Sequence, residues 1–295
     1  MKPTTFSQVK QAFIEDRDLF IAEQTVDMYE RTLSTFANVI EDKWPINSND
    51  IKAFIRNRRE KGNQDGYINI ILKCIKTLCR WAVKKKLLKE NPFDGLPYQK
   101  ILQKPQLPPV LTSKEIQAVL ETARNIDGYG KRNYAFLMLE METGMRPGEI
   151  LSLPVENIDL QSDPPTVKIP KEGKRGERIL PITVKTKRAI QSYLRVRKGS
   201  SFGPLFLTKE GSPMNRNAIT RVLYRIKKRL NLRKLYLYQL RHTFATESLK
   251  NGSDLEYVRR MLGHTSFAVT QRYTHYRVDD LAVIQKRASP VNRTR

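Results

Sequence analysis

The chain has 295 residues, and 54 lysines and arginines against 30 acidic residues give it a net charge of +24. That length suits two domains, and such an excess of positive charge favours a polyanionic partner, most often nucleic acid. No segment has the ~20 apolar residues of a membrane span, and the N-terminus lacks the apolar core of a secretory signal. The cysteines, Cys74 and Cys79, are too few for a disulfide framework or a zinc site, so we expect a reducing compartment, the cytoplasm and its nucleoid.

Residues 1–100 carry helical periodicity and no strand pattern. Thr25 is expected to cap one helix and Asn47 or Asn49 a second, and a stripe of apolar side chains marks a longer helix over 67–88. The longest helix ends in three consecutive lysines, which suit the negative end of a helix dipole. We expect a small domain of four helices.

Residues 101–111 are expected to link two domains, because three prolines within five residues cannot continue a helix and favour an extended strap. The charge also changes across this segment. Residues 1–105 hold 19 basic and 13 acidic side chains, whereas residues 106–295 hold 35 and 17. The second half therefore carries most of the excess positive charge.

The second half shows mixed periodicity that is mainly helical. Thr112 and Glu115 form a capping-box pattern that opens a helix to about Ala123, and an apolar helix over 131–143 stops at Gly144. Two short β-type runs, at 166–170 and 178–182, are expected to form a hairpin with a basic tip. Further helices are expected at about 184–198, 215–230, 239–250, 254–262 and 266–276.

Four short motifs follow one another in this half. Residues 143–150 read Thr-Gly-Met-Arg-Pro-Gly-Glu-Ile, with an arginine at the turn between two helices, and Lys171 opens the hairpin turn. Residues 238–246 read Tyr-Gln-Leu-Arg-His-Thr-Phe-Ala-Thr, and Leu-Gly-His at 262–264 is followed nine residues later by Tyr273. Each motif alone is weak, since an arginine beside glycine is usually a surface residue and a tyrosine on an amphipathic helix is usually part of the core. Their joint order and spacing favour a functional site.

Together these motifs resemble the tyrosine recombinases, the phage-integrase-type site-specific recombinases, and the resemblance covers the whole chain. It implies a mainly α fold with a small β-hairpin or sheet: a helical core-binding, DNA-binding domain at 1–100, a linker at 101–111, and an α+β catalytic domain with a C-terminal tail at 112–295. It also implies an enzyme of DNA recombination and integration, often carried by mobile genetic elements, that cleaves and rejoins DNA through a 3′-phosphotyrosine intermediate.

The family's catalytic set transfers to this chain residue by residue. The matching positions are Arg146, Lys171, Tyr238, Arg241, His264 and, as the nucleophile, Tyr273. One position departs from the usual pattern, because the family usually has a histidine where this chain has Tyr238. In this respect the chain resembles some archaeal integrases, which also have a tyrosine there. A tyrosine with a pKa of about 10 is a poor base at pH 7, although it can donate a hydrogen bond to phosphate.

These residue types suit attack by a phenolic oxygen on a DNA phosphodiester. The transition state carries extra negative charge on the non-bridging oxygens, and an arginine's planar, permanently charged fork can grip them. A lysine on a flexible hairpin can protonate the leaving 5′ oxygen. The covalent intermediate keeps the bond energy, and no carboxylate cluster suited to Mg²⁺ is visible, so we expect no metal, ATP or other cofactor.

A basic segment between 215 and 241 is expected to lie against double-stranded DNA, because it contains no acidic residue. The alternative is a merely solvated basic helix. The expected DNA-contact residues are Asn215, Arg216, Asn217, Arg221, Arg225, Lys227 and Lys228. Recombination of two duplexes further implies a homotetramer on DNA during synapsis, formed from a protein that is a monomer in free solution.

Two other functions share these features. A type IB topoisomerase-like relaxase would use the same nucleophile but would work alone and without sequence choice. A non-catalytic architectural protein on the same scaffold would bind DNA without cutting it, and Tyr238 is the only feature that favours it. Covalent adducts with a suicide substrate separate the enzymes from the architectural protein, and strand exchange between two sites separates the recombinase from the topoisomerase.

Overall fold

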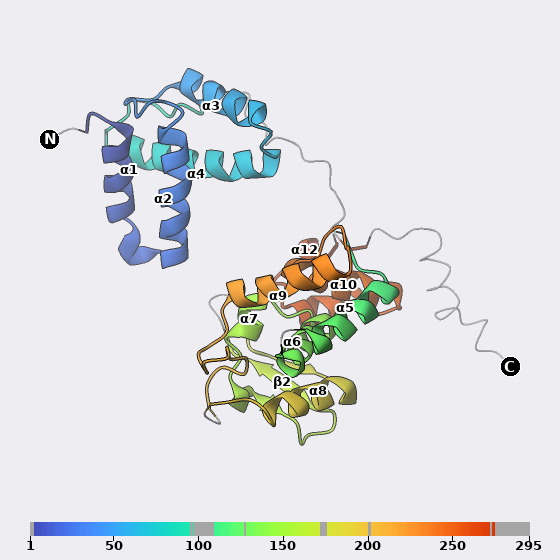
Figure 1. The fold of residues 1–295 in the computed structure, drawn as a ribbon. Helices are drawn as coiled ribbons and strands as arrows, with labels where there is room; N and C mark the ends of the chain where they lie inside the picture. The colour runs from blue at the N-terminus through green and yellow to red at the C-terminus, as the bar shows by residue number, and fades with distance from the viewer. Residues whose placement is uncertain are drawn as a thin grey trace. The chain divides into compact units, whose positions relative to one another are not determined.

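A computed structural model describes residues 3–94, 96, 109–126, 128–171, 176–199, 202–271 and 273–274. The chain divides into two compact units, Met1–Gln106 and Leu107–Arg295, which are described separately below (Figure 1). The tip of the hairpin turn, the C-terminal tail and most of the expected linker lie outside the described residues. In the part of the chain that is described, no helix combines the length and the apolar character needed to cross a membrane.

The first unit is helical over its described residues, as expected. Its elements are α1 (Phe6–Glu15), the short 3₁₀ helix η1 (Asp18–Phe20), α2 (Glu23–Ala37), α3 (Ser48–Glu60) and α4 (Asp65–Lys84). Asn47 caps α3 in a capping box with Asp50, which decides between the two caps considered above. The expected cap at Thr25 is wrong, because α2 begins two residues earlier.

An apolar core fastens these helices to one another. The Phe13 ring meets Trp81 of α4 edge-on, with ring centroids 5.5 Å apart. The Trp81 indole N–H donates to Asp16 Oδ2 at 2.8 Å, so its polar end is satisfied just past α1. Helix α4 ends at Lys84 rather than at 88, and Lys86 takes a left-handed φ of 59° as the chain turns away.

The second unit is mainly helical with a small antiparallel sheet. Its elements are α5 (Ser113–Asn125), α6 (Gly130–Thr143), α7 (Pro147–Leu151), η2 (Val155–Asn157), β1 (Ile158–Asp159), β2 (Thr166–Ile169), β3 (Arg178–Pro181), α8 (Val184–Leu194), α9 (Arg216–Arg229), α10 (Leu237–Lys250), α11 (Leu255–Leu262) and α12 (Phe267–Gln271). The capping box of Thr112 and Glu115 is present at the start of α5.

The sheet has the order β1-β2-β3, and the β2–β3 hairpin confirms the expected pair of strands. Strand β1 was not predicted, because two residues are too few to show an alternating pattern. In the hairpin, Ile169 pairs with Arg178 at the end next to the turn. This register places Arg178 at the first position of β3, and its side chain contributes to the site described below.

Helix α6 lies at the centre of the second unit and packs against α5, α8 and α10 (Figure 1). It buries apolar residues together with polar ones, Arg132, Asn133, Glu140 and Thr143. A helix with buried residues on most of its surface loses the 3.6-residue alternation of a surface helix. The buried polar groups near its C-terminal end belong to the site.

Candidate active site

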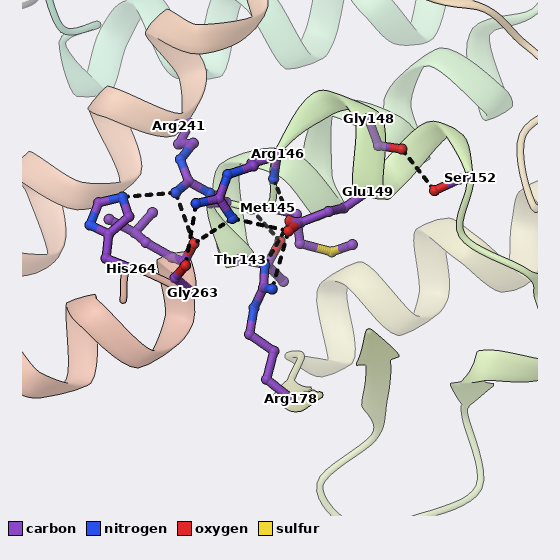
Figure 2. Close-up of polar contacts among 12 residues, drawn as sticks. Thr143, Met145, Arg146, Gly148, Glu149, Ser152, Arg178, Arg241, Gly263 and His264 are labelled. Carbon is purple, nitrogen blue, oxygen red and sulfur yellow. Dashed lines mark hydrogen bonds and ion pairs between the residues drawn. The ribbon is translucent and has the colours of Figure 1, made fainter. Parts of the chain in front are cut away.

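Arg146 is positioned by a sharp turn between α6 and α7. Gly144 ends α6 in the left-handed conformation, with φ 60°, and a Cβ there would lie 2.7 Å from Leu262 Cδ2. Pro147 then opens α7, so Arg146 is its N-cap residue. The Arg146 backbone N–H donates to Glu149 Oε2 at 2.8 Å, and its Nη1 donates to Glu149 Oε1 at 3.1 Å (Figure 2). One carboxylate thus orients both the backbone and the side chain of this arginine.

The C-terminal end of α11 orients two arginines at once. Gly263 ends this helix with a left-handed φ of 62°, which leaves the last carbonyl groups without partners in the helix. Arg146 donates to Leu262 O at 3.3 Å and to Gly263 O at 3.2 Å, and Arg241 Nη2 donates to Leu262 O at 2.8 Å (Figure 2). The negative end of the helix dipole favours these cations. Two guanidinium groups from different helices therefore share one carbonyl acceptor.

Arg241 of α10 is buried, and three contacts hold its side chain. Its Nη1 donates to Gly144 O, and its Nη2 meets Leu262 O and His264 Nε2, the latter at 2.9 Å. Burial and the neighbouring charge of Arg146 lower the pKa of Arg241 to about 10, so the group remains charged at neutral pH. These contacts leave part of its five N–H donors for a ligand, and a bound anion would offset the cost of burying its charge.

His264 connects Arg241 to the segment that carries Tyr273. Arginine is only a donor, so His264 Nε2 must accept, and its Nδ1 then carries the proton and donates to Thr270 Oγ1 at 2.9 Å. Thr270 lies in α12, and its carbonyl accepts the backbone N–H of Tyr273 at 3.0 Å. Both ring nitrogens of His264 are therefore engaged in positioning.

Tyr273 is buried next to the arginines, and its hydroxyl lies 2.7 Å from Nδ1 of His242. The two rings are tilted at 45°, with centroids 5.6 Å apart. The tyrosine also interacts electrostatically with Arg241, since its negative form would raise the pKa of that arginine. His242 belongs to the motif at residues 238–246, but no role was predicted for it. Its position next to Arg241 was the only signal available.

A second buried ion pair, which the sequence analysis missed, supports Arg146 from the side of the sheet. Arg178 of β3 donates to Glu149 Oε2 at 2.6 Å and to Glu149 Oε1 at 3.2 Å (Figure 2). Burial by itself would raise the pKa of Glu149, but the hydrogen bonds and charges of Arg178 and Arg146 outweigh it and lower that pKa. Glu149 is therefore ionised at neutral pH. The pairing joins residues of a helix and a hairpin, and no local pattern predicts it.

The summed charge of the cluster is positive. Three guanidinium groups meet there, those of Arg146, Arg178 and Arg241, against one ionised carboxylate, Glu149. A second carboxyl group, Glu140, is fully buried, and burial raises its pKa well above the ordinary value despite the opposing charges of Arg241 and Arg216. Among the described residues, no group of three His, Cys, Asp or Glu side chains could hold a metal ion. The arrangement is suited to an anion such as a phosphate diester.

The other two expected catalytic residues lie outside these contacts. Tyr238, at the start of α10, is 41% exposed and stacks with the guanidinium of Arg216, whose central carbon lies 5.5 Å from the ring centroid. Lys171 is exposed just beyond β2, and the turn residues 172–175 are outside the described ranges. The cluster thus contains Arg146, Arg241, His264 and Tyr273 but not, in this structure, Tyr238 or Lys171.

The expected DNA-contact residues lie along α9. Its apolar side, with Ile219, Val222 and Ile226, is buried in the core, whereas most of its basic side chains are exposed. Asn215 caps this helix, because its side-chain oxygen accepts the N–H of Ala218 at 2.9 Å. Of the seven expected contact residues, all are exposed except Lys227, which is half-buried.

Comparisons with known proteins agree with this site. A model of the phage integrase family matches residues 109–279. The tyrosine recombinase XerD of Halalkalibacterium halodurans is 30% identical over 86% of this chain and 88% of its own length, and the XerC of Pelobacter propionicus is 33% identical over 76% and 73%.

Solved structures share the fold. The integrase of the transposon Tn1549, in complex with transposon right end DNA, superposes with a TM-score of 0.78 at 20% identity, covering 96% of this chain and 99% of that one. A lambda integrase dimer bound to a core site gives a TM-score of 0.75 at 15% identity, covering 90% of this chain and 97% of that one. The match of the family model over the cluster of arginines, histidine and tyrosine places the chain in the phage integrase family of tyrosine recombinases, enzymes that cleave and rejoin DNA at specific sites.

Proposed function

We propose that Tyr273 is the nucleophile of this recombinase and that Arg146 and Arg241 hold the phosphate that it attacks. The observation that carries the proposal is the shared acceptor, Leu262 O, which fixes two guanidinium groups side by side next to the tyrosine. Both groups are oriented by backbone carbonyls before any ligand binds, and preorganised donors of this kind stabilise charge that develops in a transition state. His264 positions Arg241 and the helix before Tyr273.

The reaction then proceeds without an external energy source. The Tyr273 oxygen forms a bond to phosphorus, the bond from phosphorus to the 5′ oxygen breaks, and the 3′ end stays attached to the protein. Lys171 gives the leaving 5′ oxygen its proton. The phosphotyrosine keeps the energy of the broken bond, so a 5′ hydroxyl can reverse the step and rejoin the strand.

Tyr238 occupies the place of the histidine that precedes the second arginine in the usual family pattern. We infer that its hydroxyl donates a hydrogen bond to the DNA backbone and does not act as a base that takes up a proton at neutral pH. Its exposure and its stacking with Arg216, the first residue of α9, support this role, because they turn the ring towards a basic surface.

Two further levels of organisation belong to the same proposal. The helical domain at 1–100 acts as the core-binding domain, and α9 lies against the duplex. Two DNA-bound dimers pair into a tetramer that exchanges strands in the cytoplasm, at the nucleoid, and the resulting activity is integration, excision or dimer resolution. The solved structure of a lambda integrase dimer bound to a core site supports DNA binding as a dimer.

A suicide substrate tests the nucleophile. A duplex nicked next to the cleavage position loses the short 5′ fragment, so the covalent adduct accumulates with the wild-type chain. Tyr273→Phe should abolish the adduct and leave DNA binding nearly unchanged, because phosphate contacts dominate affinity. Tyr276→Phe is the matched control. An adduct that persists in Tyr273→Phe and disappears in Tyr276→Phe would move the nucleophile to position 276.

Strand exchange separates the recombinase from the remaining enzyme alternative. Two labelled duplexes that carry the site should exchange arms with the wild-type protein. Relaxation of supercoiled DNA by a monomer, with no exchange and no sequence preference, would identify a type IB topoisomerase-like activity instead.

A further inference from the structure

We propose that His242 accepts the proton of Tyr273 during cleavage and returns it during rejoining. The inference rests on the proposed role of Tyr273 as the nucleophile. The observation behind it is the 2.7 Å contact between the tyrosine hydroxyl and His242 Nδ1, which is within the range of a short O–H···N hydrogen bond. A candidate general base must lie within hydrogen-bond reach of the proton that it abstracts, and His242 meets that requirement.

His264 cannot serve as this base in the same arrangement. Its Nε2 accepts from Arg241 and its Nδ1 donates to Thr270, so neither nitrogen has a lone pair directed at Tyr273. The chain has three histidines, and the third, His275, lies outside the described residues. Within the described part of the site, His242 is the histidine that contacts the nucleophile.

His242 and Tyr238 lie on the same helix, α10. His242 follows Tyr238 by four residues on α10, and residues four apart on a helix lie on the same face one turn away from each other. The structure thus places a histidine one helical turn beyond the position where the usual pattern of the family has one.

The Tyr273 O–H bond breaks, its proton forms a bond to His242 Nδ1, and the phenolic oxygen bonds to phosphorus. The bond from phosphorus to the 5′ oxygen breaks, and that oxygen takes a proton from the general acid. An imidazole is a much weaker base than a phenolate, so the transfer accompanies formation of the bond to phosphorus.

Charged groups from several elements interact with Arg241, which in turn interacts with Tyr273. They are Glu140 of α6, Arg146 and Glu149 at α7, Arg178 of β3 and His264 after α11. The positive charge of Arg241 favours the phenolate form of Tyr273. Arg241 therefore assists removal of the proton from Tyr273.

His242→Asn tests the proposal in the full chain. Asparagine keeps a polar group near the position of Nδ1 but cannot take a proton. The measurement is the single-turnover rate of adduct formation against pH, on a suicide duplex with a sulfur at the 5′-bridging position, which makes a general acid unnecessary. We expect a rate lower by roughly 10²–10⁴-fold and loss of the low-pH limb that the wild-type histidine produces. Glu247→Gln, an isosteric change on the same helix, should have neither effect.

A fluorinated tyrosine at position 273 distinguishes a base from a positioning group. A more acidic phenol needs less help from a base, so it should restore much of the rate in His242→Asn, and a packing defect would not respond. Should His242→Asn fail to fold, the fluorinated wild-type chain serves instead, and its low-pH limb should weaken.

Different failures have different meanings. A wild-type rate and pH profile in His242→Asn, or an unchanged limb in the fluorinated chain, would overturn the role of His242 while Tyr273 stays the nucleophile. An adduct that forms in Tyr273→Phe would instead overturn the proposed function itself.

Discussion

At the scale of single residues, Glu140 stands out because it is a fully buried carboxyl group whose two oxygens have no hydrogen-bond partner among the described residues. Burial raises its pKa well above the ordinary value. A group with a raised folded-state pKa stabilises the fold fully below its unfolded pKa, about 4.3, and loses that contribution as the pH rises through the folded value. Glu140 therefore makes the second unit less stable at neutral pH than a neutral side chain would.

Glu140→Gln should raise the free energy of unfolding at pH 7 by at least about 1 kcal/mol, since one pKa unit corresponds to about 1.4 kcal/mol. The gain should shrink towards pH 4, where the wild-type carboxyl is protonated in both states. Urea unfolding at a series of pH values measures it, with the exposed Glu121→Gln as the control. A difference that is constant with pH would show that Glu140 is charged in the folded protein.

At the scale of elements, the β2–β3 hairpin connects the sheet to the arginine cluster. Ile169 pairs with Arg178, and Arg178 is fastened to Glu149 by two hydrogen bonds. Lys171 follows Ile169 by two residues, so the ion pair anchors the hairpin next to the residue that is proposed to act as the acid. The side chain of Lys171 is exposed.

Lys171→Ala should slow cleavage by roughly 10²–10⁴-fold, the usual effect of a lost general acid. A substrate with a 5′-bridging sulfur should restore the rate, because a thiolate leaves without a proton. Rates of adduct formation on the oxygen and sulfur substrates provide the measurement. Lys174→Ala is the matched control, and selective rescue of that variant instead would assign the acid to Lys174.

At the scale of the whole molecule, the charge difference between the two halves concentrates the electrostatic attraction on the second unit. Arg221 and Arg225 lie on the exposed side of α9, and each phosphate contact adds about 0.9 to the slope of log affinity against log salt. Arg221→Ala and Arg225→Ala should each lower that slope by about 1 and weaken binding to all sequences alike.

Lys185→Ala, on the exposed surface of α8, is the control for this measurement, which uses DNA binding at several salt concentrations. An unchanged slope in the α9 variants would mean that this helix is a solvated basic surface rather than a DNA contact. A loss confined to one DNA sequence would mean that the arginine contacts bases instead of phosphates.

Much of the fold follows from local patterns. Three local predictions are confirmed because each depends on neighbouring residues: the capping box at Thr112, the stop at Gly144 and the paired strands of the hairpin. Of the two caps considered for α3, the structure has Asn47. The predicted helix ends were less accurate. Helix α8 ends at Leu194 rather than at 198, and α10 begins two residues before the expected 239. Packing against other elements decides where a helix ends, and a sequence window does not contain that information.

The sequence by itself determined the family and predicted which residues act on a phosphodiester, because residue type and spacing carry that information. Only the tertiary structure decided which of them meet. It joined Arg146 to Arg241 through Leu262 O, Arg178 to Glu149, and Tyr273 to His242, whereas it placed Tyr238 with Arg216. These contacts link residues of different helices and strands, and which faces come together depends on how the core packs rather than on any local periodicity.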